Sequence, residues 1–210
     1  MQAKLANYQN IPAELRALHQ WVTWKYEDVG AAKPTKVPNG SVSDSNTWST
    51  FDLCLEVVAH GKADGIGFVF TDNDPYTGID LDAAGDDWLA IERQQKIFKE
   101  FDSYSEISVG GQGLHIIIKG QIPVGRKRSK IEIYSSKRYF TFTGNVYHKS
   151  PIQDRQQLLN MLWEQMGASI PQTMLFTGDK QEKNTDQEII EQAKLANNSE
   201  KFLTLFQGNW

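Results

Sequence analysis

Stretches in which apolar and polar residues alternate predict short β-strands along much of this chain. Aromatic and β-branched residues, which favour strands, are concentrated in the same stretches. The close spacing of the later strands favours antiparallel hairpins, and the turn signal at residues 72–75 favours another between residues 65–70 and 78–82. The predicted strands are residues 21–26, 65–70, 78–82, 105–109, 114–119, 129–134 and 139–143.

Helix signals predict four helices before, between and after these strands. The first covers residues 11–20, and the second begins at a capping-box pattern in residues 49–52 and can end at Gly61. The third extends to about residue 102, with a buried face made of Trp88, Ile91, Phe98 and Phe101. The fourth begins at Ser150-Pro151 and ends at Gly167, with a buried face made of Leu158, Leu159, Leu162 and Trp163.

Prolines and polar segments indicate how the chain is divided. Two prolines in residues 33–40 forbid a helix and predict an extended edge segment or loop. Periodicity is lost over residues 168–184, which we interpret as a linker after a main domain of residues 1–167. Residues 185–210 have the pattern of two short helices that cannot form a core of their own, so we expect them to dock on the main domain or to begin a further domain that is cut short.

The composition is that of a soluble globular protein, because 40% of the 210 residues are hydrophobic and 23% are charged. No apolar run approaches the ~20 residues that a membrane helix needs, and the N-terminus lacks the apolar core of a signal peptide. The single cysteine, Cys54, excludes an internal disulfide framework and a cysteine-rich zinc site. We therefore expect a cytoplasmic protein with no membrane partner.

The charges are distributed unevenly, although the net charge is only −4. Residues 71–106 carry ten acidic and three basic side chains, whereas residues 119–149 carry eight basic side chains and one acid, Glu132. Local field matters more than net charge for a polyanionic ligand. An acidic segment followed by a basic one fits an enzyme that handles phosphates, and two ordinary solvated faces would give the same pattern.

The sequence Gly78-Ile79-Asp80-Leu81-Asp82 places two carboxylates in one predicted strand. Side chains two residues apart in a strand point to the same face, so Asp80 and Asp82 should stand side by side. Two like charges held so close repel one another, and hard divalent cations such as Mg²⁺ or Mn²⁺ prefer carboxylate oxygens. The pair alone is weak evidence for a metal site, because an exposed strand end with two solvated acids has the same sequence.

Three glycines in four residues precede a histidine in the stretch from Ser108 to His115. Glycines let the backbone turn sharply and approach a ligand closely. A histidine in such a strand often makes a single hydrogen bond in a core, but the glycine-rich turn favours a role in binding phosphate or metal.

Glu132 lies on the opposite face of its predicted strand from the flanking isoleucines. If this strand neighbours the one that carries Asp80 and Asp82, three carboxylates can converge on two metal ions, which is the usual arrangement for displacement at phosphorus. Arg138 can bind phosphate oxygens with two parallel hydrogen bonds. The alternative is that Glu132 pairs with Lys130 or Lys137 at the surface.

Taken in order, these motifs resemble the primase-polymerase domain of the archaeo-eukaryotic primase superfamily, and most closely the bifunctional domains at the N-terminus of phage and plasmid replication proteins. The resemblance covers roughly residues 11–165. It is carried by Asp80-x-Asp82, Ser108-x-Gly110-Gly111-x-Gly113-Leu114-His115 and Glu132-Ile133-Tyr134 followed by Arg138-Tyr139-Phe140-Thr141-x-Thr143-Gly144.

The resemblance implies template-directed nucleotidyl transfer to a 3′-hydroxyl, with release of pyrophosphate and with two Mg²⁺ or Mn²⁺ ions. Asp80 and Asp82 would bind the metals together with Glu132, and His115 would act at the catalytic site on the phosphates of the incoming NTP or dNTP. The other implied nucleotide-binding residues are Ser108, Gly111, Gly113, Arg138 and Lys33. The implied DNA-binding residues form a basic loop, Arg126, Lys127 and Arg128.

The implied fold is α/β in the broad sense, or α+β. An N-terminal αβ module would pack on a mixed or antiparallel sheet like that of an RNA-recognition motif, with short helices at the C-terminal end. Residues 185–210 would then begin a helical accessory domain, often followed by a helicase domain in such replication proteins. Single-stranded DNA template and primer would be the partners, in the host cytoplasm if a phage encodes the protein.

Two other functions use the same residues. A metal-dependent nuclease would employ the carboxylates with water in place of the 3′-hydroxyl. The chain could also be a replication module that binds nucleic acid without catalysis.

Overall fold

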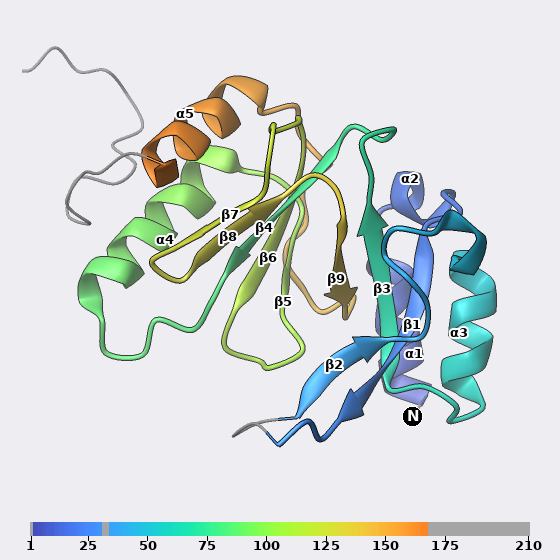
Figure 1. Cartoon of the computed structure of the whole chain (residues 1–210). Helices are drawn as coiled ribbons and strands as arrows, with labels where there is room; N and C mark the ends of the chain where they lie inside the picture. Colours follow the sequence, from blue (N-terminus) through green and yellow to red (C-terminus); the bar gives the residue numbers. More distant parts are fainter. Residues whose placement is uncertain (1, 31–33, 168–210) are drawn as a thin grey trace, which may run out of the picture. The chain divides into compact units, whose positions relative to one another are not determined.

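The computed structural model describes residues 2–30 and 34–167 (Figure 1). They lie in the first of two compact units, Met1–Phe176. Lys33, the expected linker at 168–184 and the expected helices in 185–210 fall outside the described residues. Within them the chain combines helices with two antiparallel sheets, which confirms the predicted α+β class.

The smaller sheet has four strands in the order β2-β1-β3-β9, and every neighbouring pair is antiparallel. Its first strand fits the aromatic and β-branched sequence predicted for it. The proline-flanked segment forms the edge strand β2, as expected. The strands are β1 Trp21–Glu27, β2 Thr35–Pro38, β3 Gly65–Phe70 and β9 Arg138–Phe142.

The larger sheet has six strands in the order β10-β5-β6-β4-β8-β7, again antiparallel throughout. Strand β4 lies inside it, between β6 and β8. The strands are β4 Tyr76–Leu81, β5 Ser105–Ile107, β6 Leu114–Lys119, β7 Arg126–Arg128, β8 Ile131–Tyr134 and β10 Val146–His148.

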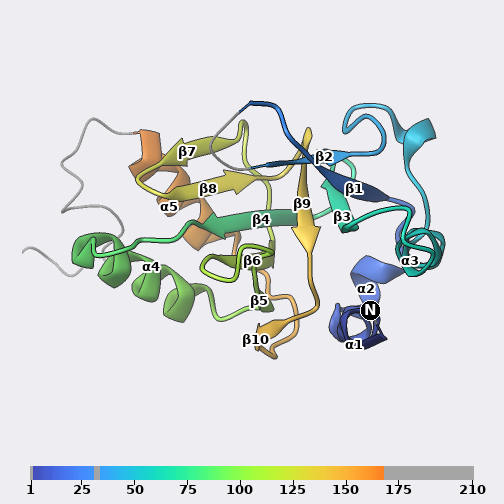
Figure 2. The same ribbon diagram turned by 90° about the horizontal axis from the view of Figure 1, so that it is seen from below.

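The helices lie on the outer sides of the two sheets (Figures 1 and 2). Helices α4 and α5 cover one face of the larger sheet, and α3 lies beside β1 and β3. The α-helices are α1 Gln2–Asn7, α2 Ala13–Arg16, α3 Phe51–Ala59, α4 Trp88–Phe101 and α5 Gln156–Gly167. Two short 3-10 helices are η1 Tyr8–Asn10 and η2 Ser45–Thr47.

Two hydrophobic clusters hold these layers together. In the first, the ring of Trp21 meets those of Phe51, Phe68 and Phe142 edge-on at 5.1, 5.3 and 5.4 Å between centroids. Cys54 is buried in the same cluster, where burial raises the pKa of its thiol to about 11, so it is a core residue. The second cluster packs the larger sheet on α4 and α5 through side chains that include Ile79, Leu81, Ile116, Ile131, Ile133, Ile97 and Leu159.

The predicted hairpin between residues 65–70 and 78–82 is wrong. Strand β3 pairs with β1 and β9, whereas β4 pairs with β6 and β8 in the other sheet. The connecting turn is held by the carboxylate of Asp74, which accepts hydrogen bonds from the backbone N–H groups of Thr71 and Tyr76 at 2.9 and 2.8 Å. The same carboxylate accepts from the amide of Gln20 at 2.7 Å, so a distant residue helps to lead the chain out of the first sheet.

Other local predictions were also inexact. The predicted face of α4 is wrong for Trp88 and Ile91, which are exposed, because the buried face follows Ala90, Ile97 and Phe101. The helix expected at 11–20 is a single turn, α2, and the cap of α3 is Thr50. Strands β7 and β10, of three residues each, were not predicted.

Candidate active site

Strand register brings the sequence-predicted residues of the site together in one row across the larger sheet. Asp80 on β4 is directly opposite His115 on β6 and Glu132 on β8. Directly opposed residues of an antiparallel pair point to the same face. Their neighbours Ile79, Leu81 and others point to the opposite face, into the core beneath α4 and α5. Burial of the isoleucine face therefore fixes the polar row on the side that faces away from those helices.

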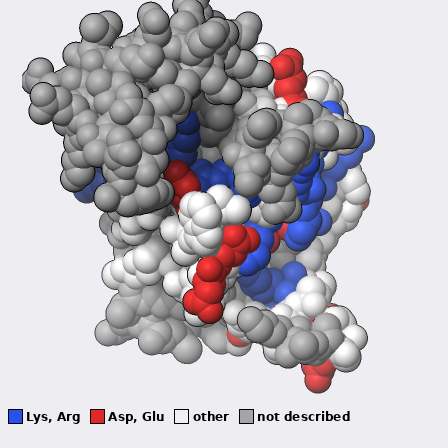
Figure 3. Space-filling model, turned by 90° about the vertical axis from the view of Figure 1, so that its left-hand side faces the viewer, with Lys and Arg blue, Asp and Glu red and all other residues white. Residues whose placement is uncertain are grey.

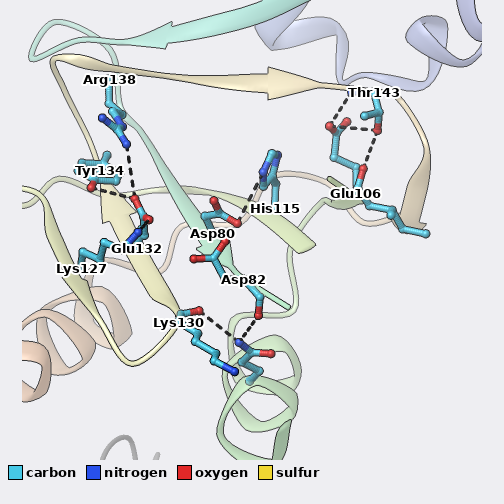
Figure 4. A network of polar contacts seen from close by, with 12 residues as sticks. Asp80, Asp82, Glu106, His115, Lys127, Lys130, Glu132, Tyr134, Arg138 and Thr143 are labelled. Carbon is cyan, nitrogen blue, oxygen red and sulfur yellow. Dashed lines mark hydrogen bonds and ion pairs between the residues drawn. The ribbon is translucent and has the colours of Figure 1, made fainter. Parts of the chain in front are cut away.

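His115 is a buried neutral base next to Asp80. Its Nε2 lies 3.7 Å from Oδ1 of Asp80, and its ring packs on Phe140 at 4.9 Å between centroids (Figure 4). The pKa of His115 is lowered to about 4, first by burial and then by the charge of Lys36, while a hydrogen bond with the backbone of Thr141 opposes the shift. The imidazole is therefore uncharged near neutral pH. It can form a hydrogen bond with a ligand, but it does not attract an anionic ligand by charge.

The carboxyl group of Asp80 has a pKa well above its ordinary value. Its pKa is raised to about 7, first by burial and then by the carboxylates of Asp82 and Glu132, while the charges of Lys36 and Lys127 oppose the rise. Asp82 follows β4 and is anchored through its backbone N–H, which donates to the Lys130 carbonyl at 2.9 Å. Figure 4 shows the two aspartate carboxyl groups close together, as their spacing in the sequence predicts.

Glu132 is almost completely buried, and both of its carboxylate oxygens have partners. Lys127 donates to Oε1, the Tyr134 hydroxyl donates to Oε2 at 2.9 Å, and a guanidinium nitrogen of Arg138 lies 3.7 Å from Oε2. Burial alone would raise the pKa of Glu132, but the hydrogen bonds from Lys127 and Tyr134 and the two cations hold it below its ordinary value. The pairing that the sequence left open is thus made with Lys127 and Arg138, not with the lysines at 130 and 137.

A pocket of about 380 Å³ opens over this row of residues. Strands β2 and β9 of the smaller sheet form its other wall, with Lys36 and Arg138 contributing positive charge. Its lining consists of Pro34, Thr35, Lys36, Asp80, His115, Glu132, Arg138, Tyr139, Phe140 and Thr141. Figure 3 shows Lys and Arg side chains gathered on one face of the molecule with acidic side chains among them.

The donor set fits a divalent cation at the aspartate pair. Carboxylate oxygens are the ligands that Mg²⁺ and Mn²⁺ prefer, and a cation between Asp80 and Asp82 would relieve the repulsion that raises the pKa of Asp80. Within residues 2–30 and 34–167, however, no three Asp, Glu, His or Cys side chains are arranged to hold one ion together. For Glu132 to join them as a metal ligand, Lys127 would first have to leave its carboxylate.

A phage protein is similar in sequence to this chain. No family model matches the chain. Over 144 residues the chain is 37% identical to a protein of Nitratiruptor phage NrS-1 named DNA primase-polymerase, and the match covers 61% of this chain and 19% of the phage protein. The chain is a homologue of a phage primase-polymerase. The resemblance inferred from the sequence motifs is thereby confirmed, for a chain that spans about a fifth of its relative's length.

The glycine-rich turn lies beside the end of β4 rather than in the 380 Å³ pocket. Gly111 and Gly113 line a separate cavity of about 280 Å³ together with Leu81 and residues of α4. A Cβ at Gly113 would lie 2.9 Å from the Leu81 carbonyl and from the Ser108 hydroxyl, so glycine is needed for this close approach. The predicted nucleotide-binding role of Ser108, Gly111 and Gly113 stays a prediction.

The three basic residues predicted to bind DNA form strand β7 rather than a loop. The guanidinium carbon of Arg126 lies 3.4 Å from the centre of the Trp163 ring, and Arg128 donates to the carbonyl of Gln165 at 3.1 Å. These two arginines thus pack against the C-terminal part of α5, while Lys127 pairs with Glu132. Their binding to DNA stays a prediction.

Sequence reasoning missed one cation of the site, Lys36. Lys36 lines the pocket and acts electrostatically on both Asp80 and His115, although only Lys33 of this segment was chosen as a site residue. Strand alternation from the edge strand β2 would have placed Lys36 on one face with Pro34 and Pro38.

The part of the chain that the structure describes has no helix with the length and apolar character needed to cross a bilayer.

Proposed function

We propose that this chain is the catalytic domain of a primase or polymerase, which transfers nucleotides to a 3′-hydroxyl under the direction of a DNA template. The observation that carries the proposal is the row of Asp80, His115 and Glu132 in one pocket with two cationic side chains. The similarity to a phage protein named DNA primase-polymerase supports the reaction class. Activity, substrates and partners of the whole protein are proposed on the same ground.

Each side chain of the pocket has a task in such a reaction. Asp80 and Asp82 would hold Mg²⁺ or Mn²⁺, and Glu132 would join them once Lys127 has left its carboxylate. The bound metal would stabilise the negative charge of the attacking hydroxyl and of the leaving pyrophosphate. Neutral His115 would form a hydrogen bond with a phosphate of the incoming nucleotide. Arg138 would bind phosphate oxygens, since its planar guanidinium donates in pairs.

The nucleic acid would be a primed single strand of DNA. Lys36 and Arg138 line the pocket together with the acids, and a polyanion is held mainly by such positive charges. A helicase domain elsewhere in the full-length protein and residence in the host cytoplasm complete the proposal.

Primer extension tests this function. The protein is incubated with a labelled primer on a longer template, with NTPs or dNTPs and with Mg²⁺ or Mn²⁺. We expect the primer to lengthen, and we expect Asp80→Asn and Asp82→Asn to abolish extension while DNA binding is largely retained, because the acids serve the metal. Glu92→Gln, on the exposed face of α4, is the matched control and should extend normally.

The same assay separates the alternatives. Shortening of the primer without extension would favour a nuclease that uses these carboxylates with water. Unchanged primer together with dNTP and metal binding that survives an Asp80→Ala, Asp82→Ala double substitution would favour a binding module without catalysis.

A further inference from the structure

Among the strands that the structure describes, register places one cation, Lys127, directly in the row of site residues. It is opposite Glu132 in the β7–β8 pair, as Glu132 is opposite Asp80 in the β8–β4 pair. Arg126 and Arg128 are opposite Ile133 and Ile131, so they share the isoleucine face and Lys127 shares the face of the acids. Figure 4 shows its side chain reaching the Glu132 carboxylate.

The contact occupies one of the two oxygens with which Glu132 could bind a metal ion. Lys127 donates to Oε1, while Oε2 is held by Tyr134 and lies 3.7 Å from Arg138. In this arrangement Glu132 contributes to no three-residue metal cluster among the described residues. The carboxylate is thus already neutralised by a charge that belongs to the protein.

Lys127 can leave at low cost, whereas Glu132 cannot. The Lys127 side chain is 64% exposed on a three-residue edge strand, and the Glu132 side chain is 9% exposed. A released ammonium group regains water at once, but a buried carboxylate without a cation would pay a desolvation penalty. Exchange of Lys127 for a divalent cation keeps Glu132 neutralised at every stage.

We propose that Lys127 is a positioning residue that serves as the internal counter-ion of Glu132 and competes with the second metal ion for its carboxylate. This inference rests on the proposed function, because it assumes that a metal site forms at Asp80 and Asp82. It predicts that Lys127 occupies the Glu132 carboxylate in the metal-free protein, and that a metal ion must displace Lys127 in order to bind there.

The test measures Mn²⁺ binding to the whole chain by calorimetric titration or by the Mn²⁺ electron paramagnetic resonance signal, without DNA or nucleotide. Lys127→Met should bind Mn²⁺ more tightly, by roughly three- to ten-fold, because an ion pair with one buried partner no longer competes. Lys127→Gln should behave in the same way and serves as the second variant if the first folds poorly. Lys127→Arg, which keeps the charge, should show little or no gain.

A matched control separates local competition from a general loss of positive charge. Lys130 lies in the same basic segment, but its ammonium group donates to the Ala84 carbonyl at 2.7 Å. Lys130→Met should change Mn²⁺ affinity by less than about two-fold, since a charge outside the contact is screened by solvent. In a Glu132→Gln background, Lys127→Met should give no gain.

Three results would overturn the inference: equal gains in the Lys127 and Lys130 variants, a gain that persists without the Glu132 carboxylate, or no measurable Mn²⁺ binding by any variant. Primer extension judges the proposed function separately. If extension depends on Asp80 but Lys127→Met leaves metal affinity unchanged, the polymerase proposal stands and the counter-ion proposal fails. If Mn²⁺ affinity rises as expected but no variant extends a primer, the counter-ion proposal stands and the polymerase proposal fails.

Discussion

Replacing Asp80 with asparagine should stabilise the metal-free protein at pH 8 while abolishing its activity. The pKa of Asp80 is raised from 3.8 to about 7, by burial first and then by the carboxylates of Asp82 and Glu132. A raised pKa means that the folded state favours the protonated acid. The stability that this group contributes is therefore fully present below pH ~4 and is lost as the pH rises through about 7.

The magnitude follows from the size of the pKa difference. One pKa unit corresponds to ~1.36 kcal/mol, so a rise of this size corresponds to about 4 kcal/mol at pH 8 as an upper limit. The side chain of Asp80 is 24% exposed, and solvent reduces the penalty. Asparagine keeps the size but cannot ionise, so we expect Asp80→Asn to be about 2 kcal/mol more stable than the wild type at pH 8.

Urea unfolding in the presence of EDTA measures this difference, and the advantage of the variant should shrink as the pH falls toward 4. Glu92→Gln controls for the loss of a negative charge, because Glu92 is exposed on α4. Addition of Mn²⁺ should stabilise the wild type and leave Asp80→Asn unchanged, since only the former retains both aspartates. A variant that is less stable than the wild type at pH 8, or a gain equal to that of Glu92→Gln, would refute the reasoning.

Three further substitutions test how the fold supports the site, each by urea unfolding. Gly78→Ala would place a Cβ 2.5 Å from the ring of Phe140 and should cost ~1–3 kcal/mol; an unchanged midpoint would show that the ring moves freely. Arg126→Ala removes the stacking on Trp163 and should cost ~1–2 kcal/mol, whereas a stability equal to wild type with weaker DNA binding would assign Arg126 to DNA. Glu106→Ala leaves two buried backbone N–H groups after β9 without their acceptor and should cost ~2–4 kcal/mol, with Glu106→Gln less affected; equal stability of all three proteins would contradict that role.

Much of the candidate site could be predicted from the sequence because it depends on strand alternation. Alternation alone puts Asp80 and Asp82 on the same face, and the isoleucines around Glu132 put that carboxylate on the side away from the core. The order of the strands in the sheet was not predictable in the same way. That β4 lies between β6 and β8 depends on long-range pairing, which no local pattern records.

The division into two sheets shows this limit most clearly. Residues 65–70 and 78–82 are separated by a polar turn of the kind that connects hairpins, and each has strand character. What separates them is the side chain of Asp74, which binds its own turn, and the amide of Gln20, which binds Asp74 from 54 positions away. A sequence shows which residues can form a local turn, but it does not show that a residue as distant as Gln20 will bind that turn.

The basic run at residues 126–128 shows how a correct rule can be left unapplied. Three consecutive cations after a glycine are typical of a loop that contacts nucleic acid, and three residues are too few to display alternation. Once the segment pairs with β8, alternation sends its middle residue to the face opposite that of the other two. Arg126 and Arg128 then stabilise the packing of α5, while Lys127 neutralises the third carboxylate of the site. The division of roles within this run follows from the backbone conformation rather than from the charge of its residues, and for that reason the metal-binding test of Lys127 and the stability test of Arg126 should give independent results.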